Sequence, residues 1–227
     1  MEKRHPGTLA RTLSWSASAL RWILVATLFI PVVLVMSHDS QPQADSEPVW
    51  IQEVQKPEPK ELVKIYSIVR HHRPDISETE AWQLSQLILD ESSGYDLDPM
   101  LVLAVIDVES KFQYEAVSPA GARGIMQILP YVGKFLLQEI GWHYASELRP
   151  FRPEFLDDPV LNIKLGVYYL HDLRKNFRNL THTLTAYNIG PTETKNRLDN
   201  DLELSDKYAS AVLTIYHKHK KTPLHSF

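Results

Sequence analysis

Residues 99–110 read PMLVLAVIDVES, an apolar run with two carboxylates near its end, Asp107 and Glu109. The run is long enough for about three helical turns. Asp98 followed by Pro99 is a typical helix start, because Asp accepts from free backbone N–H groups and Pro suits the first helical position. On such a helix, Glu109 shares a face with the apolar side chains three, four and seven residues before it.

A carboxylate on an apolar face is poorly solvated, and desolvation raises its pKa. A carboxylic acid that keeps its proton near neutral pH is suited to general acid catalysis, for example at a glycosidic oxygen. Taken alone, the run around Glu109 is more typical of a helix-end glutamate that turns toward solvent. The rest of the sequence decides between these two interpretations.

Two further stretches combine turn signals with polar side chains. Residues 118–130 read SPAGARGIMQILP, in which glycines permit unusual backbone angles and Gln127 interrupts an apolar run. Residues 185–191 read TAYNIGP, where Gly-Pro ends a helix beside Tyr187 and Asn188. Amide and phenol groups in such places bind a polar ligand or satisfy the local backbone. Each stretch alone is compatible with either role.

Together the three stretches resemble one family. Glu109-Ser110, the pattern SPAGARGIMQ over residues 118–127 and AYN over residues 186–188 are similar to the soluble lytic transglycosylase catalytic domain. That domain belongs with goose-type lysozyme to the lysozyme-like superfamily. The resemblance covers roughly residues 92–219, and the motifs occur in the same order and at the same spacing.

The resemblance implies a mainly α (α+β) fold, a lysozyme-like helical domain with a small β element near residues 116–128. It also implies cleavage of the MurNAc-β-1,4-GlcNAc bond of peptidoglycan, with formation of a 1,6-anhydroMurNAc end. Glu109 would be the single catalytic acid, and the substrate would supply its own nucleophile. No metal or other cofactor is expected. The substrate-binding residues implied are Ser118, Met126, Gln127, Tyr187, Asn188 and Tyr208.

The resemblance also assigns individual roles. Met126 and Gln127 are expected to line the muramyl subsite, and Tyr187 to contact the acid or the acetamido group. Tyr208 corresponds to a second active-site tyrosine. Two other polar residues are expected to brace the fold through hydrogen bonds, Ser110 and Asn162.

Two other functions remain open. A hydrolytic goose-type lysozyme needs a positioned water and a second carboxylate near the cleft. The nearest acids are Asp107, which a helix turns away from Glu109, and Glu115, which the sequence does not place. A non-catalytic wall-binding scaffold would keep the fold without turnover.

The N-terminal region is typical of a targeting segment. Within residues 1–37, four basic residues precede an uncharged apolar run over 22–36, which is short for a membrane span and long for a signal-peptide core. The positive flank predicts a cytoplasmic N-terminus and a periplasmic remainder. Residues 19–37 are expected to anchor the protein in the inner membrane; the alternative is cleavage after Ser37 and a soluble periplasmic protein.

The remaining composition limits the possible partners. The chain has no cysteine, which excludes disulfides, thiolate metal sites and an N-terminal lipid-modified cysteine. The chain has 24 Lys+Arg and 28 Asp+Glu, and four of the basic residues lie before residue 38. The part of the chain from residue 38 onward is therefore acidic, which disfavours nucleic acid as a partner. Protein partners are unknown, and His71-His72 and the basic residues 217–221 are expected to be solvated surface.

The pattern predicts four segments: the targeting segment 1–37, a Pro-rich linker over 38–60, a helical extension over 61–91 and the catalytic domain over 92–222. A Ser77 cap begins one of the helices, because Ser-x-x-Glu is a capping box. Apart from 99–110, helices are expected over 62–69, 78–88, 130–139 (ending at Gly141), 159–177, 183–188 and 204–217.

Overall fold

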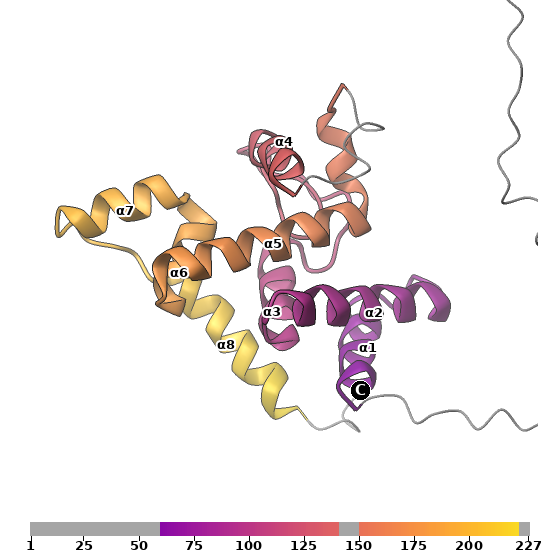
Figure 1. The fold of residues 1–227 in the computed structure, drawn as a ribbon. Coiled ribbons are helices and arrows are strands. Elements are labelled where there is room, and N and C mark those ends of the chain that lie inside the picture. Colours follow the sequence, from indigo (N-terminus) through magenta and orange to yellow (C-terminus); the bar gives the residue numbers. More distant parts are fainter. Residues whose placement is uncertain (1–59, 141–149, 223–227) are drawn as a thin grey trace, which may run out of the picture. The chain divides into compact units, whose positions relative to one another are not determined.

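A computed structural model describes residues 60–140 and 150–222. The predicted targeting segment and nearly all of the predicted linker lie outside these residues. The described part is built of helices (Figure 1), which confirms the mainly α fold. The helices are α1 (Lys60–His72), α2 (Glu78–Gly94), α3 (Pro99–Ser110), α4 (Pro130–Glu139), η2 (Pro153–Asp157), α5 (Pro159–Phe177), α6 (Leu180–Ile189), α7 (Pro191–Asp199) and α8 (Lys207–Lys221).

Side-chain caps explain where several helices begin. The Asp98 carboxylate accepts from the Met100 N–H at 2.9 Å, and the Ser77 hydroxyl accepts from the Glu80 N–H at 3.1 Å. Each cap satisfies a backbone donor that has no partner within its helix. The predicted helices over 99–110, 130–139 and 159–177 are confirmed, since α3, α4 and α5 have these bounds. The predicted end of α4 at Gly141 lies outside the described residues.

The C-terminal helices differ from the prediction. Helix α6 begins at Leu180, earlier than predicted, because the Asn179 side chain caps it by accepting from the His182 N–H at 2.9 Å. Helix α8 begins at Lys207 rather than at residue 204. Helix α7 was not predicted, because Gly190-Pro191 was interpreted only as a stop. Pro191 ends α6 and also occupies the first turn of α7.

The predicted β element is confined to isolated bridges. Val117 pairs with Arg123, and Arg123 pairs with Ile128, both antiparallel. The described residues contain no longer strand, since the chain turns at Gly121 and again at Gly124, both with positive φ. The result is a compact loop rather than a sheet.

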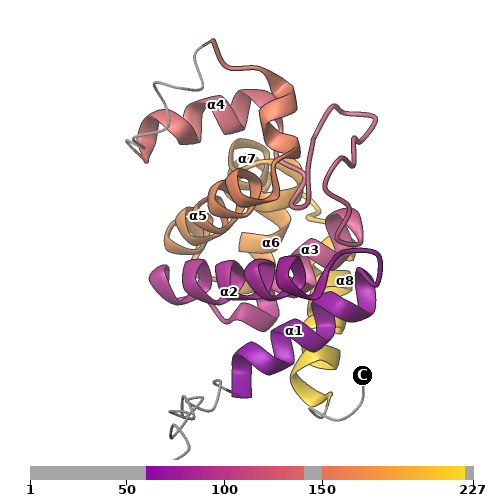
Figure 2. The same ribbon diagram turned by 90° about the vertical axis from the view of Figure 1, so that its right-hand side faces the viewer.

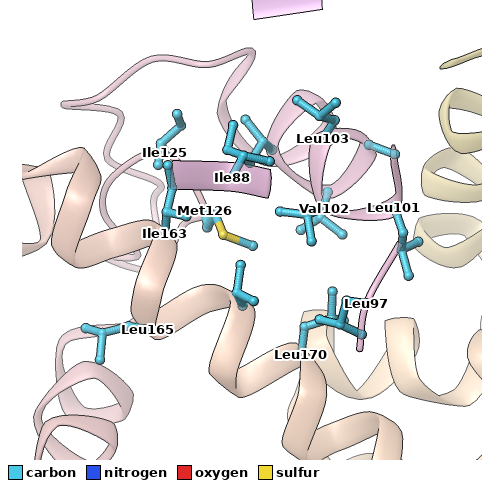
Figure 3. Packing of buried hydrophobic residues seen from close by; sticks show 14 of the residues in the cluster. Ile88, Leu97, Leu101, Val102, Leu103, Ile125, Met126, Ile163, Leu165 and Leu170 are labelled. Atoms are coloured by element: carbon cyan, nitrogen blue, oxygen red, sulfur yellow. The ribbon is translucent and has the colours of Figure 1, made fainter. Parts of the chain in front are cut away.

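Helix α3 forms the centre of the core. It packs against α1, α2 and α8, while α5 lies between α2 and α4 (Figures 1 and 2). Val102 and Leu103 are fully buried, and Figure 3 shows them in the same apolar cluster as Ile163 and Leu165 of α5. The burial of α3 on nearly every face fixes its C-terminal turn, which carries Glu109. None of the helices within residues 60–140 and 150–222 has the length and apolar character needed to cross a membrane.

Two histidines that were expected on the solvated surface are removed from solvent, His219 almost fully and His72 in part. His219 is only 4% exposed, and its Nε2 lies 3.9 Å from Asp107 Oδ2 without a hydrogen-bond partner. The His72 ring stacks on Phe112 with ring centroids 4.5 Å apart. The prediction was wrong because α1, α3 and α8 meet at this point, a contact that the local sequence does not encode.

Acid should therefore destabilise the domain through His219. Burial lowers the pKa of His219 from 6.5 to about 4. The unfolded chain binds this proton more readily, so the stability contributed by neutral His219 is present above pH 6.5 and is lost as the pH falls toward 4. When the pH is lowered from about 7 to about 4.5, we expect the thermal midpoint of His219→Leu to fall less than that of the wild type. His217→Leu, at an exposed site, is the control; equal acid sensitivity in the two variants would contradict the prediction.

Candidate active site

A cavity of about 270 Å³ opens beside the C-terminal turn of α3. Its lining comes from α3, the loop over residues 118–129, the start of α4, the middle of α5 and the end of α6. The predicted site residues that line this cavity are Glu109, Ser118, Gln127, Tyr187 and Asn188. Segments that are distant in sequence thus line the same cavity.

The Glu109 carboxyl is largely removed from water. Burial raises its pKa to about 7, and a hydrogen bond from Tyr208 opposes this rise by favouring the charged form. The Tyr208 hydroxyl donates to Glu109 Oε1 at 2.5 Å. Tyr208 belongs to α8 and does not line the cavity itself. It therefore contacts the acid without being part of the cavity lining.

Met126 does not lie where the resemblance implied. Its side chain is fully buried, and it packs so closely over Gly166 that a Cβ there would lie 2.5 Å from the Met126 sulfur. The expectation that Met126 lines the subsite was wrong, because this turn directs its side chain into the core. Its backbone carbonyl instead accepts a hydrogen bond from the Tyr187 hydroxyl at 2.9 Å.

Ser118 and Gln127 stabilise the loop that forms one wall. The Ser118 hydroxyl oxygen accepts from the Ala122 N–H at 3.0 Å. Gln127 adopts a left-handed backbone with φ 51°, and its amide nitrogen donates to the carbonyls of Ala116 at 2.8 Å and Gly124 at 2.9 Å. These bonds use both amide protons of Gln127, so its carbonyl oxygen is the group left for a ligand.

Asn162 braces the same loop from α5. Its Oδ1 accepts from the Met126 N–H at 2.7 Å, and its Nδ2 donates to the carbonyls of Arg123 at 2.9 Å and Leu156 at 2.7 Å. The Ser110 hydroxyl adds a bond to the Ile125 carbonyl at 2.7 Å. The predicted bracing roles of Asn162 and Ser110 are confirmed. The wall of the cavity is thus fixed from two helices.

Glu109 is the only carboxyl that lines the cavity in the described part of the chain. Asp107 lies on the other side of α3, where Lys111 Nζ donates to it at 2.7 Å. Glu115 is exposed and lies outside the lining. Within the same residues, His, Asp and Glu nowhere gather in a group able to hold a metal ion.

Two tyrosines of the cavity were not predicted. Tyr169 packs against Tyr187 with ring centroids 5.4 Å apart, and Tyr131 stands at the start of α4. Tyr169 follows Asn162 by seven residues, so both lie on one face of α5. That spacing could have indicated Tyr169. No sequence signal distinguishes Tyr131, which simply follows Pro130.

Comparisons with known proteins show which proteins the chain resembles. The chain is 32% identical over 136 residues to a membrane-bound lytic murein transglycosylase C of Serratia proteamaculans (strain 568), covering 56% of this chain and 36% of that protein. The homologous protein of Salmonella paratyphi B (strain ATCC BAA-1250 / SPB7) is 32% identical over 146 residues, covering 60% and 39%. The chain thus spans little more than a third of the length of these curated relatives.

The fold has a solved counterpart. The 70 kDa soluble lytic transglycosylase of Escherichia coli aligns with a TM-score of 0.55 at 22% identity, covering 70% of this chain and 28% of that one. This likeness confirms the predicted lysozyme-like fold. The model of the family described as "Transglycosylase SLT domain" matches residues 86–210. Because that match spans more than half of the 227 residues, the chain belongs to the transglycosylase SLT domain family.

Proposed function

We propose that the chain is a peptidoglycan lytic transglycosylase, which cleaves the MurNAc-β-1,4-GlcNAc bond and leaves a 1,6-anhydroMurNAc end. The observation that carries the proposal is the lone cavity carboxyl of Glu109, with its pKa raised to about 7 by burial. Such a group is protonated often enough near neutral pH to act as a general acid. The names of the relatives support the same activity.

In this mechanism Glu109 acts first as acid and then as base. It donates its proton to the glycosidic oxygen as the bond to C1 of N-acetylmuramic acid breaks. The 2-acetamido oxygen of the same sugar stabilises the developing positive charge. The Glu109 carboxylate then takes the proton of the 6-hydroxyl as that oxygen bonds to C1. The usual pair of carboxylates, about 5 or 6.5–9.5 Å apart, is not needed because the substrate supplies the nucleophile.

The remaining cavity residues bind the sugars. In this proposal Ser118 and the free carbonyl oxygen of Gln127 contact N-acetyl or peptide amides; their position in the cavity lining supports this role. Asn188 is exposed at the end of α6 and also lines the cavity. Tyr187 contributes its ring to the wall, while its hydroxyl holds the Met126 carbonyl. Tyr208 positions the acid through its hydrogen bond.

Mass analysis of the muropeptides released from purified sacculi tests the proposal. Anhydromuramyl ends are expected from the purified chain. Reducing ends would identify a hydrolytic lysozyme instead, and the absence of release together with retained wall binding would identify a scaffold.

The pH dependence of turnover should follow Glu109. The acid must be protonated, so kcat/KM is expected to decline as the pH rises through about 7. In Tyr208→Phe the bond that favours the charged carboxylate is lost, so the pKa of Glu109 rises and the decline should move to higher pH. Tyr216→Phe is the control, because its hydroxyl donates to Asp98 at 2.8 Å. An unmoved profile in Tyr208→Phe would exclude Glu109 as the titrating group.

We further propose that residues 1–37 hold the protein at the inner membrane, with residues 38–60 as a spacer. The spacer would lead through the helices over 61–91 to the catalytic domain over 92–222, in the periplasm. The apolar run after four basic residues supports this arrangement, as do relatives named membrane-bound.

Cell fractionation checks the membrane proposal. The full chain is expected in the inner-membrane fraction, and deletion of residues 1–37 should retain it in the cytoplasm. A soluble periplasmic protein that begins at His38 would show instead that Ser37 is a cleavage site.

A further inference from the structure

Tyr131 is the one tyrosine of the described residues that is mostly exposed, at 72%. It lines the cavity that contains Glu109, yet most of its ring faces solvent. Phe135, one helical turn further along α4, is 57% exposed. Because residues four apart share a helix face, the two exposed rings lie on the same side of α4 and are called the aromatic strip below. Tyr131 lines the cavity and Phe135 does not, so the strip extends beyond the cavity lining.

This strip has no evident role in folding. Among the described elements, α4 packs chiefly on α5 and η2 (Figures 1 and 2). Its buried residues include Gly133 and Leu137, which are not on the side that carries the aromatic strip. Single exposed apolar residues are common, but neighbouring exposed aromatics beside a cavity mark a binding surface. The strip is therefore suited to a ligand that also enters the cavity.

The volume of the cavity indicates that the ligand extends beyond it. Its volume of about 270 Å³ is close to the lower end of the roughly 300–1,000 Å³ typical of small-molecule clefts, so a long polymer must extend outside it. The neighbouring units of the polymer must lie at the mouth, where the Tyr131 ring stands. A pyranose ring has an apolar face of C–H groups, which packs flat on an aromatic ring while its hydroxyls stay in water.

We propose that Tyr131 is a stacking platform for a sugar ring outside the catalytic cavity, and that it makes cleavage depend on the length of the glycan strand. Phe135 extends the platform by one turn. This inference rests on the proposed function, since it assumes a glycan in the cavity. A protein partner is the less favoured occupant, because Tyr131 shares its cavity with Glu109.

Kinetics on strand fragments of two lengths test the platform. The full chain in detergent is assayed on an alternating tetrasaccharide and octasaccharide. Tyr131→Ala is expected to lower kcat/KM for the octasaccharide by roughly three- to tenfold more than kcat/KM for the tetrasaccharide, because only the longer fragment places a sugar ring beyond the cavity. Tyr131→Phe keeps the ring and should behave as wild type. Leu202→Ala, which removes another exposed apolar side chain (52%) away from the cavity, is the matched control.

Equal losses on both fragments, or no loss on either, would overturn the platform. A binding measurement distinguishes failure of the platform proposal from failure of the proposed transglycosylase function. Octasaccharide affinity is measured calorimetrically in Glu109→Gln with and without Tyr131→Ala, where no turnover is required. Weaker binding in the double variant supports the platform even if the wild type releases no anhydro product. Unchanged octasaccharide affinity contradicts it, whatever the activity.

Discussion

Replacing Glu109 by glutamine is expected to reduce release of anhydromuropeptides from purified sacculi by roughly two to four orders of magnitude. The amide has the same shape, and it can still accept the hydrogen bond from Tyr208, but it cannot transfer a proton to the leaving oxygen. The fold and strand binding should persist. Glu115→Gln is the matched control, because this exposed carboxyl lies outside the cavity. A Glu109→Gln variant with more than about a tenth of wild-type turnover would show that another group is the acid.

The same substitution should change stability in a pH-dependent way. The pKa of Glu109 is about 7 in the folded domain against 4.5 as a free side chain. Folding therefore favours the protonated form of Glu109. The stability that protonated Glu109 contributes is fully present below pH 4.5 and is lost as the pH rises through about 7. Glu109→Gln has no charge to bury. Its thermal midpoint should match that of the wild type near pH 4.5 and exceed it near pH 8. The corresponding gain in the free energy of unfolding at pH 8 is up to about 3 kcal/mol.

The local parts of the site could be predicted from sequence. The position of Glu109 follows from helical periodicity and from the Asp98 cap, both of which act within a few residues. The bracing role of Asn162 came from the family resemblance, and it agrees with the general rule that a buried amide bonds to nearby backbone groups. These predictions hold because each depends on short-range geometry that the core then reinforces.

The parts that depend on tertiary packing could not be predicted in the same way. Tyr208 reaches Glu109 across 99 residues only because α8 packs on α3, and its role came from resemblance rather than from periodicity. The burial of His219 depends on the same helix contact. Met126 was misassigned because the left-handed turn at Gln127 sets its direction, and a single sequence does not specify that turn.

Gly124→Ala is expected to cause the largest loss of stability among single substitutions in the cavity wall. Gly124 has φ +82°, and a Cβ there would overlap the Leu156 carbonyl and the Asn162 side chain. The added methyl group costs about 1–2 kcal/mol for the left-handed backbone and about 1–3 kcal/mol for overpacking. Displacing Asn162 also weakens its three hydrogen bonds, at about 1 kcal/mol each. The sum of roughly 5–8 kcal/mol is comparable to the whole stability of a domain.

Gly121 provides the matched control for this prediction. It has nearly the same backbone angle, φ +81°, but no atom lies within 4 Å of the Cβ that alanine would add. Gly121→Ala should therefore incur only the backbone cost, a fall of a few degrees in the thermal midpoint. Gly124→Ala should lower the midpoint by more than about 10 °C or prevent folding. Circular dichroism melts of the two variants measure the difference. The backbone cost is common to both variants. Similar midpoints would therefore mean that overlap of the added methyl group with Leu156 and Asn162 does not destabilise the loop.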